Sequence, residues 1–345
     1  MSFIQLRITA IVQETADTKT FFVEPVEQTT VHYKAGQFIT LIFRLNGREV
    51  RRSYSLGSSP LADHQLFFTV KRKINGEISR HLQDYYNEGD ILTALLPSGM
   101  FTIERSETST YFFIAAGSGI TPVFSLLKEL LYRNSDTHII LINQCRDEQN
   151  IIYKKALNEL QIKFATRFEL IIFFSRPPAG SFPVHLNNLL LENIIQQKLR
   201  IVKYESIRFY LCGPLAFMRM AEFTTRLMGF LSEQIKKEQF VIDPPPSAPL
   251  ISDISSKMLT VHYQKKIFKL ETKYPVTVLD AGLKKGIPLP YSCKAGICGT
   301  CVAKCVNGKI IMSRDEVLTE KDIENGLILT CVGYAVTDVE LDFDK

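Results

Sequence analysis

The sequence predicts a folded protein of three modules: an antiparallel β-barrel, an α/β unit with a parallel sheet, and a smaller α+β unit. Three observations predict this organisation. Short β-branched or aromatic runs fill the N-terminal third of the chain, strand-like and helical segments alternate from about Thr110, and a proline-rich stretch precedes a cysteine-rich C-terminal segment. At 345 residues the chain is long enough for two or three domains of ordinary size.

Composition narrows the class of protein. Hydrophobic residues make up 46% of the chain and charged residues 22%, the balance of a globular protein rather than a disordered one. The net charge of +5 is small for this length, which argues against a nucleic-acid binder with a general basic surface. The apolar runs have strand length, short of the roughly 18 residues of a membrane span. With no recognisable signal peptide, we expect a cytoplasmic protein.

The first module, predicted to span 1–106, consists of closely spaced strands. The runs FFVEP, GQFITLIF and LFFTVKRK are short and rich in β-branched or aromatic residues. They are bounded by turn signals at Asn46-Gly47, Asn75-Gly76 and Pro97-Ser98-Gly99. Short strands at close spacing are typical of an antiparallel barrel or sandwich.

The second module, 107–242, alternates strands with helices. Tyr111–Ala115 is a short apolar strand, and the predicted helices include PVFSLLKELLYRN, IIYKKALNELQIKF, a stretch near Leu186–Lys198 and PLAFMRMAEFTTRLMGF. This alternation predicts a parallel α/β sheet. Residues 243–256, DPPPSAPLISDISS, lack periodicity and are rich in Pro and Ser, so they are predicted to be a semi-rigid linker.

The third module, 257–345, opens with the strand-like MLTVHYQKKIFKLE and carries the most specific pattern in the chain. Cys293, Cys298 and Cys301 are followed by Cys331 after 29 residues, the C-x4-C-x2-C…C spacing of a plant-type [2Fe–2S] site. Three thiolates on one tight loop can reach both irons, and a fourth from a distant strand closes the site. A four-cysteine zinc site is the alternative, but zinc ribbons favour two C-x2-C pairs and only one is present.

The residues around these cysteines resemble plant-type ferredoxins over nearly the whole module. The match includes LDAGLKKGIPLPYSCKAGICGTC and the closing VELDFD. The resemblance implies a β-grasp fold and the four cysteines as cluster ligands. Gly296 and Gly299 would let the loop adopt positive φ and bring N–H groups close to the sulfurs. Of the seven cysteines, Cys145 and Cys305 are left without an assigned role.

Arg52-Ser53-Tyr54-Ser55 follows a strand and suits a flavin site. Arg52 offers a guanidinium for a phosphate, Tyr54 an aromatic face, and Ser55 a hydroxyl within reach of flavin N5. The four residues match the R-x-Y-S flavin motif of the ferredoxin–NADP reductase superfamily. Through this resemblance Ser55 becomes a candidate catalytic residue; a surface strand end is the alternative.

A second element indicates which flavin would bind. Gly76-Glu77-Ile78-Ser79 opens a predicted helix, where backbone N–H groups and the Ser79 hydroxyl can hold a pyrophosphate. A pyrophosphate implies FAD, because FMN carries only one phosphate. The resemblance to the superfamily places Lys71 and Arg72 near the adenylate side of the cofactor.

Ala115–Pro122 forms a glycine-rich turn between a strand and a helix. Gly117 and Gly119 lie in the turn, and we expect Thr121 to be the N-cap of the helix and Pro122 its first residue. Pro122 stands where a Rossmann fingerprint has its third glycine, so that fingerprint does not apply. The sequence G-S-G-I-T-P instead resembles the pyridine-nucleotide loop of the reductase superfamily.

Two further segments resemble nucleotide-binding elements of that superfamily. Cys212-Gly213-Pro214 is similar to the second nicotinamide-site loop, which makes Cys212 a candidate catalytic residue that shapes the site; the alternative is a buried thiol. Ser175-Arg176 ends a strand at a position where related reductases hold the 2′-phosphate of NADPH. We therefore expect NADPH rather than NADH; the alternative is a solvent-exposed Arg176 before Pro177-Pro178.

Together these motifs predict an enzyme in which NAD(P)H reduces FAD and FAD passes single electrons to the cluster. The module order resembles the reductase components of multicomponent oxygenases, such as the phenylacetyl-CoA epoxidase and ketosteroid hydroxylase systems. This resemblance implies an acceptor protein, an oxygenase or hydroxylase component. The alternative is an electron-transfer or redox-sensing subunit of a larger complex, without its own NAD(P)H turnover.

Overall fold

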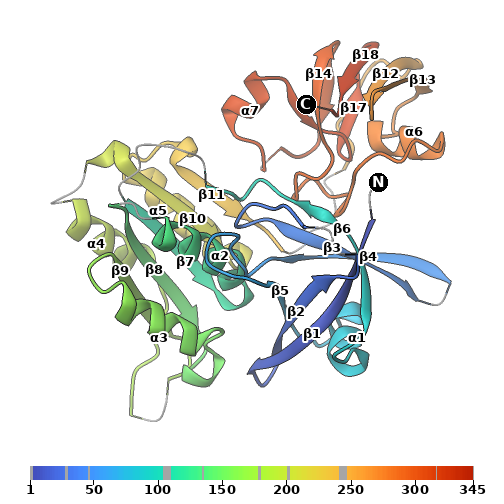
Figure 1. Ribbon diagram of the computed structural model, residues 1–345. Coiled ribbons are helices and arrows are strands. Elements are labelled where there is room, and N and C mark those ends of the chain that lie inside the picture. Colours follow the sequence, from blue (N-terminus) through green and yellow to red (C-terminus); the bar gives the residue numbers. More distant parts are fainter. Residues whose placement is uncertain are drawn as a thin grey trace. The chain divides into compact units, whose positions relative to one another are not determined.

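The computed structural model describes residues 3–27, 30–45, 47–103, 110–133, 136–177, 180–199, 203–240, 247–315 and 317–344. The chain divides into two compact units (Figure 1). The larger takes Phe3–Pro97 and Phe101–Phe240, and the smaller takes Met1–Ser2, Ser98–Met100 and Val241–Lys345. Several predicted features lie outside the described residues: Asn46, Pro178, the 106/107 boundary and the three consecutive prolines of the linker. Among the described helices, none has the length and apolarity to cross a membrane.

The N-terminal half of the larger unit is a six-stranded antiparallel sheet with the order β4-β3-β6-β1-β2-β5 (Figure 1). An isolated antiparallel bridge between Leu56 and Phe68 connects the two edges of the sheet, in agreement with the predicted barrel. The elements are β1 (Phe3–Thr15), β2 (Thr18–Pro25), β3 (Phe38–Leu45), β4 (Arg48–Ser55), β5 (Leu66–Lys71), α1 (Glu77–Tyr85) and β6 (Ile91–Ser98).

The turn predicted at Pro97-Ser98-Gly99 is wrong in part, because β6 continues through Ser98. Strand β6 pairs with β1 only as far as Leu95. Pro97 lies beyond that point, so its missing N–H removes no hydrogen bond from this ladder. A proline can therefore stay within the extended segment.

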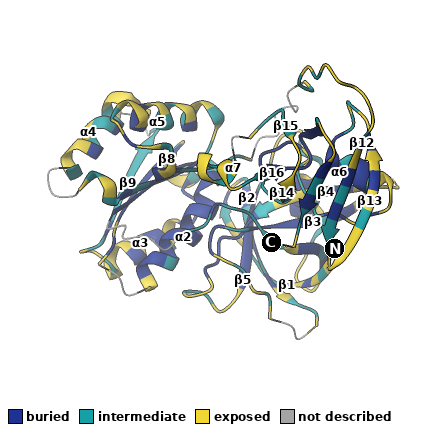
Figure 2. Cartoon of the chain, turned by 90° about the horizontal axis from the view of Figure 1, so that it is seen from above, coloured by how far each residue is buried: buried dark blue, intermediate teal, exposed yellow. Residues whose placement is uncertain are grey.

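The second half of the larger unit is a five-stranded parallel sheet, as predicted, with the order β11-β10-β7-β8-β9. Its elements are β7 (Thr110–Ala116), α2 (Ile120–Tyr132), β8 (His138–Cys145), α3 (Lys154–Lys163), β9 (Phe168–Phe174), α4 (Asn188–Leu199), β10 (Ile207–Cys212), α5 (Leu215–Leu227) and β11 (Ile235–Glu238). Alternate strand residues face opposite sides. Phe113 and Leu141 pack in one cluster with residues of α2 and α3, whereas Phe112 and Ile140 pack with α4 and α5. Figure 2 shows the buried strands between helices whose outer faces are exposed.

Helix α3 begins three residues later than the predicted helical segment, at Lys154. Tyr153 adopts a left-handed conformation with φ of 59°, which a helix cannot continue through. Its side chain is buried, and its ring stacks on Phe124 at a centroid distance of 4.3 Å. Its hydroxyl also forms a hydrogen bond with Thr69 of β5. Tertiary packing therefore overrides the helical periodicity at this position.

The smaller unit contains a mixed sheet with the order β13-β12-β18-β14-β16 and a two-stranded sheet, β15-β17. Strand β12 pairs in parallel with β18 and antiparallel with β13. The segment predicted as one strand-like opening run is a hairpin that turns at Gln264 and Lys265, both with positive φ. The elements are β12 (Lys257–Tyr263), β13 (Lys266–Thr272), α6 (Val278–Lys284), β14 (Val302–Asn307), β15 (Ile310–Met312), α7 (Glu320–Glu324), β16 (Leu327–Leu329), β17 (Gly333–Ala335) and β18 (Val339–Asp342).

Two leucines of α4 test the packing of this helix on the parallel sheet. Leu191 is 0% exposed and Leu189 is 66% exposed. We expect Leu191→Ala to lower the free energy of unfolding of the larger unit by about 2–5 kcal/mol, because it leaves a cavity. The control Leu189→Ala should stay within about 0.5 kcal/mol of the parent. Denaturant unfolding followed by circular dichroism measures both, and equal losses would contradict the packing described.

Candidate functional site

The carboxyl end of β4 meets the carboxyl edge of the parallel sheet at Ser55. The Ser55 hydroxyl donates a hydrogen bond of 3.0 Å to Oε2 of Glu238. Glu238 is the last residue of β11 and is the register partner of Cys212, the last residue of β10. Two residues predicted from separate motifs, Ser55 and Cys212, are thus brought to the same place. Glu238 is a third member of this site that sequence reasoning missed.

The surroundings of Glu238 favour its neutral form. Loss of contact with bulk water raises the pKa of this carboxyl to about 8, and the hydrogen bond from Ser55 opposes the shift. At neutral pH the carboxyl is therefore mostly protonated. It is a polar, uncharged group beside Ser55.

Cys212 is fully buried, and its environment keeps the thiol protonated. Burial raises the pKa of Cys212 well above its usual value, and the negative charge of Glu238 acts in the same direction. A thiol that stays neutral is a poor nucleophile. The geometry supports a role for Cys212 in shaping the site.

The two predicted nucleotide loops touch each other at Gly119. A Cβ atom added at Gly119 would lie 2.1 Å from the Cys212 carbonyl oxygen, which is far inside van der Waals contact. Only a glycine permits this approach. The glycine-rich turn and the segment Cys212-Gly213-Pro214 therefore form one surface at the carboxyl edge of β7 and β10, the edge where open α/β sheets bind their ligands.

The predicted capping of α2 is wrong. The helix begins at Ile120 with Gly119 as its N-cap, and no side chain caps it. Thr121 and Pro122 are the second and third residues of the helix. The reason is that Gly117–Gly119 forms a 3-10 turn that continues directly into α2, so the helix starts before Thr121 is reached. Thr121 is instead 2% exposed, with its side chain in the interior.

The flavin motif on β4 presents its residues in different environments. Arg52 and Ser53 are exposed, and the Arg52 guanidinium donates to the Arg51 carbonyl. Ser53 shares a hydrogen bond of 3.0 Å with Thr40 of β3. The Tyr54 ring lies 5.7 Å from that of Phe68. In this motif Ser55 is the buried residue that reaches Glu238.

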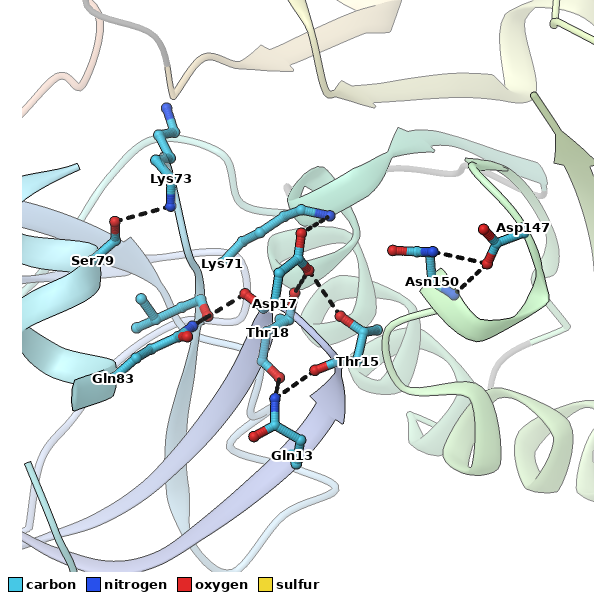
Figure 3. Close-up of polar contacts among 11 residues, drawn as sticks. Gln13, Thr15, Asp17, Thr18, Lys71, Lys73, Ser79, Gln83, Asp147 and Asn150 are labelled. Atoms are coloured by element: carbon cyan, nitrogen blue, oxygen red, sulfur yellow. Dashed lines mark hydrogen bonds and ion pairs between the residues drawn. The ribbon is translucent and has the colours of Figure 1, made fainter. Parts of the chain in front are cut away.

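The predicted pyrophosphate element forms the start of α1, with Gly76 as the N-cap residue. The Ser79 hydroxyl accepts a hydrogen bond from the Lys73 N–H at 3.1 Å (Figure 3) and donates to the Gly76 carbonyl at 3.3 Å. This hydroxyl therefore holds the turn closed. A phosphate at this position would be received by backbone N–H groups of the first helical turn.

Lys71, the last residue of β5, forms an ion pair with Asp17 in the turn between β1 and β2. Its ammonium is 3.4 Å from Oδ2 of Asp17, and Figure 3 shows it extending from β5 toward that carboxylate. Burial raises the pKa of the Cys145 thiol, at the end of β8, to about 11. The positive charge of Lys71 opposes this shift. The cation is thus close to the carboxyl edge of the parallel sheet.

Ser175 and Arg176 follow β9 at that same edge. The Ser175 N–H and hydroxyl both donate to the Cys145 carbonyl, at 3.0 and 3.3 Å. The Arg176 N–H donates to the Arg146 carbonyl at 2.6 Å, and its side chain is exposed. The neighbouring acidic residue, Asp147, accepts two hydrogen bonds from Asn150 (Figure 3).

In the smaller unit the four predicted ligands come together. The Cys293 thiol interacts with those of Cys298 and Cys331, and the Cys301 thiol with that of Cys331. The Ala295 N–H donates to the Cys293 sulfur at 3.3 Å. Four soft thiol donors, with a backbone N–H on one of them, fit an iron–sulfur cluster.

The loop that carries three of these cysteines needs left-handed backbone. Gly296 and Gly299 have φ values of 73° and 71°, as the sequence predicted, and Lys294 joins them at 53°. The fifth cysteine of this unit, Cys305, donates weakly to the carbonyls of Asn307 and Gly308 instead.

Family models match three segments of the chain. They are an oxidoreductase FAD-binding domain over residues 5–103, an oxidoreductase NAD-binding domain over 113–222, and a 2Fe-2S iron-sulfur cluster binding domain over 261–336. The chain is 33% identical over 344 residues to the ferredoxin reductase component of 3-ketosteroid-9-alpha-monooxygenase from Rhodococcus rhodochrous, covering 96% of this chain and 94% of that protein.

The chain belongs to the ferredoxin reductase components of oxygenases. The reductase is also 30% identical to a component of 1,2-phenylacetyl-CoA epoxidase from Escherichia coli K12, over 99% of this chain and 98% of that one. In fold it is similar to phthalate dioxygenase reductase, with a TM-score of 0.61 and 21% identity over 99% and 98% of the two chains. It is an oxidoreductase that carries electrons from NAD(P)H through FAD to a [2Fe–2S] cluster.

Glu238→Gln tests the titration of the site. Above a pH of about 8 the wild-type carboxyl ionises, and its negative charge would oppose the arrival of two electrons at a flavin bound beside Ser55. We expect the rate of flavin reduction by NAD(P)H to fall as the pH rises through 8 in the wild type. The glutamine keeps the size and the hydrogen bond but cannot ionise, so its profile should be flat there. Stopped-flow absorbance measures both, and identical profiles would contradict the assignment.

Proposed function

We propose that this reductase uses NADPH and delivers single electrons to an oxygenase or hydroxylase component in the cytoplasm. The observation that carries the proposal is the junction of Ser55, Glu238 and Cys212, because it puts a flavin motif against a nicotinamide loop. FAD, when bound, accepts two electrons together and releases them one at a time. The protein would hold the flavin and the nicotinamide close together, in an environment of neutral groups with little water.

The FAD-binding half would hold the cofactor through β4 and α1. Arg52 offers positive charge for the pyrophosphate, and the backbone N–H groups after Gly76 offer hydrogen-bond donors. The Tyr54 ring would pack against the flavin or its ribityl chain. Ser55 faces flavin N5. Its hydrogen bond with Glu238 orients the hydroxyl.

The nicotinamide would lie at the turns that carry Gly119 and Cys212, where the missing side chain of Gly119 lets the two loops meet and the Cys212 thiol keeps its proton. Gly213 and Pro214 complete its walls, whereas Thr121 and Pro122 are buried in the first turn of α2 and would support the surface from within. Holding two reacting atoms close together and correctly oriented accounts for a large part of the rate enhancement by enzymes.

NADPH is preferred in this proposal because of Ser175 and Arg176. Backbone hydrogen bonds to the end of β8 hold both residues, and the exposed guanidinium of Arg176 suits a dianionic 2′-phosphate. The carboxylate of Asp147 is engaged with Asn150, so it is less available to a ribose hydroxyl. Lys71 adds a cation near this edge for the phosphates of either cofactor.

Cys293, Cys298, Cys301 and Cys331 are the proposed cluster ligands, and the acceptor is an oxygenase or hydroxylase component. The support for this acceptor is that two similar proteins are the ferredoxin reductase component of a monooxygenase and a component of an epoxidase.

Arg176→Ala tests the nucleotide preference. Removing a charged donor to a phosphate costs about 1.5–3 kcal/mol, or roughly ten- to a hundredfold in affinity. We expect the KM for NADPH to rise by about that factor, while the KM for NADH, which lacks the phosphate, changes little. Steady-state kinetics with ferricyanide as acceptor measure both. A parallel rise for the two nucleotides would contradict the assignment.

Two cysteine variants test the electron path. Cys331→Ser should abolish the cluster absorbance and cytochrome c reduction but leave the reduction of ferricyanide by NADPH near the parent rate, because the flavin still accepts the hydride. The matched control Cys305→Ser should keep the cluster and both activities. Loss of the cluster in the control, or its retention in Cys331→Ser, would overturn the ligand assignment.

A further inference from the structure

Lys128 is a buried lysine in the middle of α2 that the proposed chemistry does not use. Its side chain is 7% exposed, and its ammonium forms an ion pair with Oδ2 of Asp63. The same ammonium lies 4.7 Å from the ring centre of Phe67 and 4.3 Å from that of Phe124. Burial lowers the pKa of Lys128, and Asp63 opposes this shift. Asp63 and Phe67 belong to the FAD-binding half, so the ion pair joins the two halves of the larger unit.

Two neighbouring residues of α2 bond to the same segment of the FAD-binding half. The Ser125 hydroxyl donates to the Ser58 carbonyl at 2.5 Å, and Glu129 Oε2 accepts from the Ser59 hydroxyl at 2.7 Å. Positions 125, 128 and 129 lie on one face of the helix. The Ser59 N–H also donates to Asp63 Oδ2 at 2.6 Å, which fixes the carboxylate that Lys128 meets.

The segment from Gly57 to Asp63 is packed tightly at its first residue, Gly57. A Cβ at Gly57 would lie 2.4 Å from the Phe67 ring and 2.7 Å from the hydroxyl of Tyr153, which comes from the NAD-binding half. The segment starts two residues after Ser55. Helix α2 starts directly after Gly119, the residue that touches Cys212. The contacts of Lys128, Ser125 and Glu129 therefore connect the segment that follows the flavin strand to the helix that follows the nicotinamide loop.

We propose that Lys128 is a positioning residue for hydride transfer: its ion pair with Asp63 holds α2, and with it the nicotinamide loop, at a set distance from the flavin strand. This role rests on the proposed function of the site. A purely structural ion pair would affect stability, but a positioning pair also affects the reaction step.

Lys128→Met in the full holoprotein tests the proposal, because methionine keeps the apolar stem between the two rings and removes only the charge. Anaerobic stopped-flow with increasing NADPH separates binding from the reaction step. We expect the limiting rate of flavin reduction to fall about tenfold or more, since small misplacements of reacting atoms are costly. The dissociation constant for NADPH, the FAD content and the cluster absorbance should stay near the parent values.

Leu191→Ala is the stability-matched control, since Leu191 is buried on the opposite face of the parallel sheet. It should lower thermal stability and leave the limiting rate unchanged. If Lys128→Met reduces flavin at the parent rate, or if Leu191→Ala slows it equally, the positioning role is overturned. If Lys128→Met does not fold, Asp63→Asn takes its place, and a parent-like rate in that variant overturns the role. A wild type that fails to reduce flavin overturns the proposed function itself, and the positioning role with it.

Discussion

The hydrogen bond between Ser55 and Glu238 is the contact on which the rest of the site depends. It joins the last residue of β4, in an antiparallel sheet, to the last residue of β11, in a parallel sheet. Parallel sheets bind ligands at their carboxyl edge, and in the proposed function this contact brings the flavin motif to the nucleotide site at that edge. Burial raises the pKa of this carboxyl to about 8, which favours its neutral form at neutral pH. The junction therefore carries little charge there.

The groups beside Glu238 are also small and uncharged. Cys212 is buried and keeps its proton, and Gly119 has no side chain where one would strike the Cys212 carbonyl. Neither group provides acid–base chemistry. Hydride transfer needs two flat rings in close contact and little water, and a site of small, neutral groups supplies these conditions. The ion pair of Lys128 and Asp63 is largely buried, and in the role that we propose for it the charge fixes geometry away from the reacting atoms.

Much of this organisation could be predicted from local sequence, because its signals are local. The spacing of three cysteines in one loop, the alternation of strands and helices, and the turn before α2 all depend on residues close together in the chain. Glu238 could not be found in this way. It lies 183 residues from Ser55, in a four-residue strand, IKKE, whose composition is typical of a surface segment. Only the pairing of β11 with β10 gives this glutamate a buried partner.

The errors in the sequence predictions have a similar origin. The pattern Thr121-Pro122 is a good local start for a helix, but the preceding 3-10 turn starts α2 earlier. Tyr153 lies in a segment with helical periodicity, yet its burial against Phe124 and Thr69 holds it in a left-handed conformation. In both cases contacts that are distant in the sequence, or the geometry of an adjoining turn, outweigh the local preference.

The central claim is that electrons from NADPH reach the cluster through the flavin within one chain. Anaerobic addition of NADPH to the purified holoprotein, followed by optical spectra and low-temperature EPR of the same samples, tests it most directly. We expect bleaching of the flavin together with the EPR signal of a reduced [2Fe–2S] cluster. Bleaching of the flavin with a cluster that stays oxidised would contradict it.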